Sequence, residues 1–285
     1  MIPALAGITF VAAVVNGALG YGFSSITVPL ALLFFSNRRL NPALIIIEVA
    51  LNGYVLWVNR DAARGVWRRM LPMIGGLVPG VAIGTTIVAH VDPGALRLAT
   101  FVVLLPLILL QAAGLRRPVR AERSVSVLFG AAVGVLYAVT TISGPPLAMM
   151  LNNQGLVLAE FRAALGVVRL AESSLTGAAY GAAGLVTADS AALALSIVPS
   201  VALGVPVGAW LIRRMEAELF RRICMSFDAW VVAFGISTLL RERHLVEGIS
   251  AFAVMAAVII IDASLLYRFF GTRRGGGETG DRVIE

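Results

Sequence analysis

The chain has 285 residues, of which 59% are hydrophobic and 14% are charged. Soluble globular domains average about 45–50% apolar and about 25% charged residues, so this composition excludes an ordinary soluble protein and indicates an integral membrane protein. The net charge of +7 does not indicate a nucleic-acid partner. The arginines lie in short segments between apolar runs, where their expected role is to orient the chain in the bilayer.

Apolar runs recur along the chain at close to the roughly 20 residues that a helix needs to cross a bilayer, which predicts transmembrane helices rather than a barrel. The first four runs cover residues 2–35, 42–58, 70–91 and 94–114. The next four cover 124–151, 162–184, 191–212 and 223–240, and an extra run follows at 246–270. Residues 271–285 are polar and glycine-rich, so we expect a disordered tail there.

The first run of each half is broken in its middle by small, polar and proline residues. Residues 16–31 align with residues 133–148 at a constant shift of 117, and later segments align at a shift of 124. We therefore predict two repeats, about 1–115 and 122–241, followed by an extra helix at 246–270. The aligned pairs include Gly17 with Gly134, Pro29 with Pro146, Gly80 with Gly204 and Gly84 with Gly208.

Loop charges indicate how the broken runs lie in the membrane. If each broken run is a hairpin of two short helices that enters and leaves on one face, the arginine-rich segments 60–69, 116–123 and 213–222 all face the same side. Positive-inside bias assigns that side to the cytoplasm. Three full spans then remain in each half, and an odd number inverts the second repeat relative to the first.

The predicted fold is thus an all-α polytopic transmembrane helical bundle with two inverted repeats, each opening with a broken helix, plus one extra C-terminal helix. Residues 1–270 are expected to form a single transport domain, and 271–285 a cytoplasmic tail. The N-terminus is expected outside. A removable signal peptide is not expected, because no positively charged segment precedes the first apolar run.

Two motifs resemble the paired signatures of the TauE/SafE family of sulfite exporters. They are Gly-Ala-Leu-Gly-Tyr-Gly-Phe at 17–23, leading to Val28-Pro29, and Thr-Ile-Ser-Gly-Pro-Pro-Leu at 141–147. The resemblance covers nearly the whole chain. It implies a permease of the bacterial inner membrane for small sulfur-containing anions such as sulfite, sulfoacetate or related organosulfonates, with export the usual direction.

The two breaks are the predicted anion site. A half-helix that begins inside the bilayer presents unpaired backbone N–H groups and the positive end of its dipole. Nearby hydroxyls can donate to sulfonate or sulfite oxygens, and glycines let the backbone approach closely. The alternative is that small residues only allow close helix packing, which we favour for Gly80, Gly84, Gly204 and Gly208. The predicted substrate-binding residues are Asn16, Gly20, Gly22, Ser24, Ser25, Thr140, Thr141, Ser143, Gly144 and Arg169.

Ionisable side chains inside predicted spans should face protein or water, because facing lipid would be costly. Arg169 suits an oxyanion partner, but it could instead neutralise Glu172, three residues further along the same helix. Glu48 is the repeat equivalent of Arg169, 121 residues away, and is the predicted carrier of a coupling proton. Asn52 and Asn16 could line the same cavity or bond between helices. The remaining intramembrane acids are Asp228 and Asp262.

We therefore predict a secondary transporter that works by alternating access, with the lipid bilayer, a small anion and protons as partners and with no cofactor, metal or nucleic acid. A homo-oligomer is compatible with the sequence. A membrane-embedded enzyme would need a nucleophile with a base, or clustered metal ligands. His90, His244 and the single cysteine, Cys224, do not provide them. The alternatives are a permease for another small anion such as a carboxylate, and a non-transport membrane protein.

Overall fold

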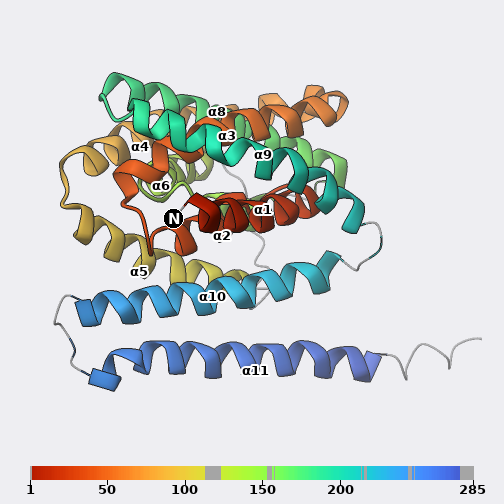
Figure 1. The fold of residues 1–285 in the computed structure, drawn as a ribbon. Coiled ribbons are helices and arrows are strands. Elements are labelled where there is room, and N and C mark those ends of the chain that lie inside the picture. Colours follow the sequence, from red (N-terminus) through yellow and green to blue (C-terminus); the bar gives the residue numbers. More distant parts are fainter. Residues whose placement is uncertain are drawn as a thin grey trace, which may run out of the picture.

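The computed structural model describes residues 2–112, 123–152, 156, 158–212, 214, 217–242, 246 and 248–276. These residues form eleven α-helices and one short 3₁₀-helix, and no strand occurs among them. Figure 1 shows the helices packed into one bundle, with α10 (Ala217–Glu242) and α11 (Ala253–Gly276) along one side. The all-α helical bundle predicted from composition and run length is confirmed.

The two halves contain the same order of elements: two helices separated by a short break, and then three longer helices. The first half comprises α1 (Ile2–Leu19), α2 (Phe23–Ala31), α3 (Asn37–Val58), α4 (Arg60–His90) and α5 (Pro93–Ala112). The second comprises α6 (Arg123–Thr140), α7 (Gly144–Asn152), α8 (Leu158–Ala182), α9 (Ala188–Leu211) and α10. The short helix η1 (Gly248–Phe252) precedes α11.

Several helices extend beyond the apolar runs into segments expected to be loop or tail. The arginine-rich segment 60–69 forms the first turns of the 31-residue α4 and is joined to α3 through Asn59. Arginine is a good helix former, and nothing in this segment stops a helix. The last helix, α11, continues to Gly276, into the segment 271–285 that was predicted to be disordered. Residues 277–285 lie outside the described residues.

Helices long and apolar enough to cross a bilayer are present in both halves. A span needs about 20 residues, and five segments of the described chain satisfy this by length and composition. Three shorter apolar segments, one each in α1, α5 and α10, accompany them. The five long segments are Asn37–Val58, Arg60–His90, Arg123–Thr140, Ala188–Leu211 and Ser250–Tyr267.

Glycines allow two helix pairs to pack with their backbones in contact. A Cβ atom added at Gly80 would overlap the carbonyl group of Ala131 on α6, and one added at Gly208 would overlap that of Val14 on α1. Close backbone approach over small residues is the usual packing of membrane helices. This is the packing role favoured above for Gly80, Gly84, Gly204 and Gly208.

The contacts also define helix directions. On α4, Gly76 lies against Val127 of α6, and Gly84 lies further along against Val135, so α4 and α6 are parallel. The pair α1 and α9 is parallel for the same reason. By contrast, α3 and α8 are antiparallel, because Ile45 lies beside Gly177 and Leu56 beside Gly166.

These directions place the helix ends at two ends of the bundle. We call one the arginine-rich end. It holds the last residues of α3 and α9 and the first of α8, which line one cavity, and α4 begins beside this cavity, directly after Asn59. The opposite end holds the first residues of α3 and α9, where Arg39 lies 3.9 Å from Asp189. The arginines near the first end include Arg60, Arg64, Arg68, Arg69, Arg123, Arg162 and Arg214.

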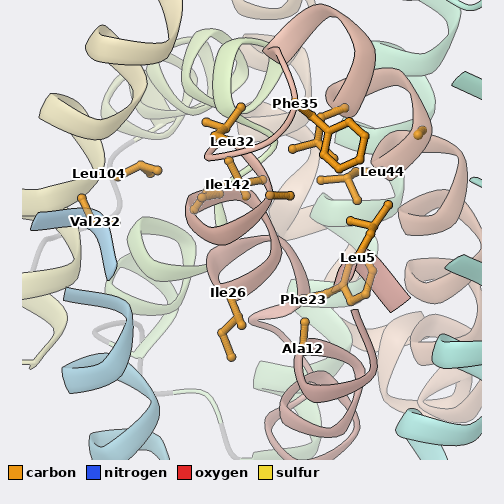
Figure 2. Close-up of a cluster of buried hydrophobic side chains, with 14 of the residues drawn as sticks. Leu5, Ala12, Phe23, Ile26, Leu32, Phe35, Leu44, Leu104, Ile142 and Val232 are labelled. Atoms are coloured by element: carbon orange, nitrogen blue, oxygen red, sulfur yellow. The ribbon is translucent and has the colours of Figure 1, made fainter. Parts of the chain in front are cut away.

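Both broken segments are hairpins. Because α1 is parallel to α9, it runs from the opposite end toward the arginine-rich end, and the chain returns through α2 to the start of α3. Similarly, α6 starts at the arginine-rich end and the chain returns there to start α8. The first hairpin packs into a large hydrophobic cluster that also contains Ile142 from the second break. Figure 2 shows Leu5, Phe23 and Ile26 of this hairpin among the other members of the cluster.

Candidate functional site

The two helix breaks depend on unusual backbone conformations. Gly20 and Gly22 have φ angles of +80° and +105°, a region that glycine occupies without steric cost. In the second break Thr141 has a φ of +57°, which is uncommon for a residue with a Cβ atom. The breaks also meet, because the ring of Tyr21 lies 3.3 Å from the Cβ position of Gly144.

Glu48 is the centre of a buried polar cluster between the two halves. Its carboxylate accepts hydrogen bonds from Ser24 Oγ at 2.7 Å, from Tyr137 Oη at 2.6 Å and from Arg169 Nη2 at 3.0 Å. These donors come from α2, α6 and α8, respectively. Hydrogen bonds to an ionised acceptor are about twice as strong as neutral ones, so this cluster ties both hairpins to α3.

The Arg169 guanidinium is only partly satisfied. Its side chain is 4% exposed, and among the described residues it forms an ion pair with Glu48. The Nε and Nη1 atoms make no hydrogen bond to any residue that the structure describes. Buried donors without acceptors are costly, more so on a charged group. These N–H groups are available to an oxyanion that enters the cluster.

Arg169 makes no close ion pair with Glu172, the structural role left open above, although the two charges interact electrostatically. Arg169 bonds across the bundle to Glu48 instead. Glu172 accepts a short hydrogen bond from Ser143 Oγ through one carboxylate oxygen, and its other oxygen has no partner within the described part of the chain. The cluster therefore contains two carboxyl groups and one guanidinium, and a proton on one carboxyl would balance its charge.

The serines of the two breaks have equivalent contacts. Ser24, at the start of α2, donates to Glu48 on the next helix of its own half. Ser143, just before α7, donates to Glu172 on the next helix of the second half. Both hydroxyls were predicted to face substrate, and in this arrangement both are bonded to a carboxylate. An incoming anion would therefore compete with these carboxylates for its donors.

The threonines of the second break bond to the backbone. Thr140 Oγ1 donates to the Leu136 carbonyl at 2.7 Å and accepts from the Ile142 N–H at 3.1 Å, which caps the end of α6. Thr141 Oγ1 donates to the Thr140 carbonyl at 2.7 Å. Ser25 is buried. These side chains hold the shape of the breaks around the cluster.

Of the two asparagines near the cluster, one lines a cavity and the other forms hydrogen bonds between helices. Asn16 lines a cavity of about 750 Å³ together with Gly20, Asn59 and Arg162. Leu165, one turn before Arg169 on α8, lines it too, so the cavity approaches the cluster from the arginine-rich end. Asn52 bonds between helices instead, donating to the Arg169 carbonyl at 3.3 Å and to Ser173 Oγ at 3.4 Å.

Two further acids were singled out by the sequence. Asp262 on α11 is fully buried and accepts hydrogen bonds from Ser226 Oγ and Trp230 Nε1 of α10, both at 3.1 Å. It therefore joins the extra helix to the bundle, away from the cluster. The side chain of Asp228 lies outside the described residues. Within the described ranges, no three His, Cys, Asp or Glu residues are grouped as a metal site would require.

Tyr137 is the member of the cluster that sequence reasoning missed. It lies within the apolar run 124–151, and nothing else in the sequence marks this position as polar. The alignment of the repeats contained a signal: at the shift of 117, Tyr137 corresponds to Gly20 in the first break. A tyrosine where the other repeat has a glycine at its break indicates a residue placed near the break, and this is the signal that could have identified Tyr137.

Multi-pass helical bundles with buried charges between two broken helices are typical of secondary transporters. A family model described as "Sulfite exporter TauE/SafE" matches residues 5–238. The chain therefore belongs to the TauE/SafE family of sulfite exporters, a family of membrane transporters, as the motifs at 17–23 and 141–147 indicated. No curated protein and no solved structure matches the chain.

Proposed function

We propose that this protein is a secondary transporter that moves a small sulfur-containing anion, such as sulfite, sulfoacetate or a related organosulfonate, out across the bacterial inner membrane by alternating access. The observation that carries the proposal is Arg169, a buried guanidinium with Nε and Nη1 unbonded between two helix breaks. A buried cation is costly and is usually retained for function. An oxyanion is the ligand that guanidinium binds best.

The anion is proposed to bind at Arg169 in exchange for Glu48. Glu48 and the anion present the same kind of acceptor to the guanidinium, so the two compete for it. Ser24 and Ser143 then donate to the anion, and the N-termini of α2 and α7 contribute backbone N–H groups. Gly20, Gly22 and Gly144 permit close approach, while Asn16, Ser25, Thr140 and Thr141 complete the proposed site.

Glu48 is proposed to carry a coupling proton. Once it is displaced from Arg169, the buried carboxylate has no cation beside it, and a proton carried on it would remove a charge that is costly inside the membrane. The anion and the proton then cross together as a neutral unit, and net export follows when the outward anion gradient exceeds the inward proton gradient. Other groups facing Glu48 are the hydroxyls of Ser24 and Tyr137, and Glu172 is the second carboxyl of the cluster.

The two halves are proposed to be inverted repeats that rock about this cluster. The equivalent helices α3 and α8 pack antiparallel, and the hairpins start from opposite ends of the bundle. Two contacts, Glu48 with Arg169 and Asn52 with Ser173, each join residues 121 apart. Contacts between equivalent residues are expected where a pseudo-two-fold axis passes between two helices.

The arginine-rich end is proposed to face the cytoplasm, with the N-terminus outside and the C-terminus inside. Three tryptophans at that end lie beside arginines: Trp57 and Arg60 at 5.5 Å, Trp67 and Arg68 at 5.5 Å, and Trp210 and Arg214 at 4.3 Å. Tryptophan concentrates at membrane interfaces, and arginine concentrates on the cytoplasmic side. Both features therefore support the same orientation.

The test is flux in vesicles reconstituted with the purified protein. Sulfite, sulfoacetate, taurine, thiosulfate and several carboxylates are supplied one at a time, with and without a pH gradient. We expect saturable flux of at least one sulfur anion. If only a carboxylate is transported, the protein is a transporter but the proposed substrate class is wrong. If monodisperse, folded protein transports no anion, the proposal is refuted.

A further inference from the structure

The two ends of the bundle differ at equivalent positions around the Glu48–Arg169 pair. At the arginine-rich end the cavity of about 750 Å³ is lined by Gly20 and Asn59. Their repeat equivalents are Tyr137, at a shift of 117, and Tyr180, at a shift of 121. Both tyrosines are fully buried. At the opposite end, two buried aromatic side chains thus stand at the positions equivalent to two residues that line the cavity at the first end.

These tyrosines belong to a compact hydrophobic cluster that we call the tyrosine plug: Ile45, Val88, Leu96, Tyr137 and Tyr180. Side-chain hydrogen bonds to backbone carbonyls of α6 hold the neighbouring helices around this plug. Tyr180 donates through its hydroxyl to the Ala138 carbonyl, and Asn41 Nδ2 donates to the Val139 carbonyl at 2.8 Å. At the arginine-rich end the cavity reaches Leu165, one turn from Arg169. At the opposite end an apolar cavity of about 570 Å³ between α3 and α8 borders the plug at Ile45 and Tyr180, and no residue of the polar cluster lines it.

Tyr137 belongs to both the plug and the polar cluster. Its ring packs in the plug, while its hydroxyl donates to Glu48 Oε2 at 2.6 Å. Glu48 uses its other oxygen to bind Arg169 and Ser24. Movement of Glu48 would therefore break or strain the one hydrogen bond that links it to the plug. Tyr180, by contrast, makes no hydrogen bond to Glu48 or Arg169 in the described structure.

We propose that Tyr137 couples the anion site to a gate at the opposite end, and that the tyrosine plug is this gate in its closed position. This inference rests on the proposed function for its physiological meaning. Displacement of Glu48 from Arg169 by an anion withdraws the acceptor of Tyr137, which loosens the plug. Tyr137 is then a positioning residue that acts through Glu48.

The experiment measures how fast a cysteine in the plug reacts, without any substrate. Cys224 is replaced by alanine, Leu96→Cys supplies the probe, and a membrane-impermeant maleimide is added either to intact cells or to inverted vesicles. Tyr137→Phe keeps the ring and removes the hydrogen bond, and Glu48→Ala removes the acceptor. Tyr180→Phe is the matched control, because it removes a hydrogen bond from the same plug without touching the cluster.

We expect slow labelling of the probe in the parent and labelling at least about tenfold faster in Tyr137→Phe, because a hydrogen bond to a charged group can shift an opening equilibrium by that factor. The faster labelling should occur only when the maleimide is added on the membrane face at the opposite end of the bundle. Glu48→Ala should give at least as large a gain, because it also removes the acceptor of Arg169 and Ser24. Adding Tyr137→Phe to Glu48→Ala should give no further gain, since the Tyr137–Glu48 hydrogen bond is already lost. Glu48→Ala with Tyr180→Phe should be additive.

Unchanged labelling in Tyr137→Phe would overturn the inference, and so would additivity of Tyr137→Phe with Glu48→Ala. A second probe, Asp61→Cys, lies at the arginine-rich end outside the cavity, where the Asp61 side chain is 83% exposed, and it should label equally in every variant, which confirms folding. The labelling pattern needs no substrate. If the labelling pattern is found but the protein transports no anion, the gate stands and the proposed function is wrong. If the protein transports an anion but the pattern is absent, only the gate is wrong.

Discussion

Glu48 and Arg169 lie 121 residues apart in the chain, and their buried side chains are joined by a hydrogen-bonded ion pair of 3.0 Å. The pair joins α3 to α8, the equivalent helices of the two halves. It leaves most of the guanidinium unbonded, which makes it both the structural link between the halves and the proposed place of anion binding. The two roles can be separated by experiment.

Replacing Arg169 by Gln should abolish anion binding and transport. It should also lower stability, because breaking a buried ion pair from one side costs roughly 3–5 kcal/mol. The double variant Arg169→Gln with Glu48→Gln should recover much of that stability but no transport. Thermal unfolding in detergent and vesicle flux measure the two effects, and Arg162→Gln, at the exposed rim of the cavity, is the control. Anion binding by Arg169→Gln at normal affinity would rule out the proposed site.

Glu48→Gln should uncouple anion flux from the pH gradient. The proposed mechanism has the anion and a proton cross together in the parent, so an acidic vesicle interior should drive net anion efflux. A glutamine cannot carry the proton and competes less for Arg169, so the anion should bind more tightly while the gradient loses its effect. Flux with and without an imposed gradient tests this.

Asp262→Asn is the matched control for that experiment, because it removes a buried carboxylate that lies away from the cluster, and its response to the gradient should be normal. If Glu48→Gln still follows the gradient while Glu172→Gln does not, Glu172 carries the proton and the role proposed for Glu48 is wrong.

Two adjacent glycines on α4 should differ sharply in their tolerance of alanine. A Cβ atom at Gly76 would overlap the Val127 carbonyl of α6, whereas one at Gly75 would have no atom within 4 Å. Overpacking costs about 1–3 kcal/mol, so Gly76→Ala should lower the melting temperature. Gly75→Ala should be neutral or slightly stabilising, since alanine favours a helix by up to about 1 kcal/mol over glycine. Equal melting temperatures would contradict the close backbone contact of α4 with α6.

Asp262→Ala should weaken the attachment of α11 to α10 and leave the anion site intact. It removes the acceptor of Ser226 and Trp230, and interhelical hydrogen bonds in membranes contribute about 0.6–1.7 kcal/mol each. We expect faster proteolysis between the two helices and unchanged apparent affinity for the anion. Loss of anion affinity in a folded variant would show that α11 shapes the site.

Much of the site was visible in the sequence because the relevant signals are local. The breaks follow from glycine and proline in apolar runs, and the buried charges follow from their isolation within spans. Ser24, Ser143, Glu48 and Arg169 were all identified as candidates, and all four lie in the polar cluster. What each of them bonds to was not predicted, since hydrogen-bond partners depend on which helices pack together.

The amino-acid sequence by itself determined that this is a membrane protein of the TauE/SafE family, built from helices with a broken segment in each half. Hydrophobicity, backbone preference and family motifs are properties of short stretches of chain. Only the tertiary structure decided that Arg169 bonds to Glu48 and not to the nearby Glu172, and that Tyr137 joins the same cluster. Those outcomes required α3 to pack antiparallel against α8, with α6 alongside, which is a relation between segments about a hundred residues apart that no local pattern specifies.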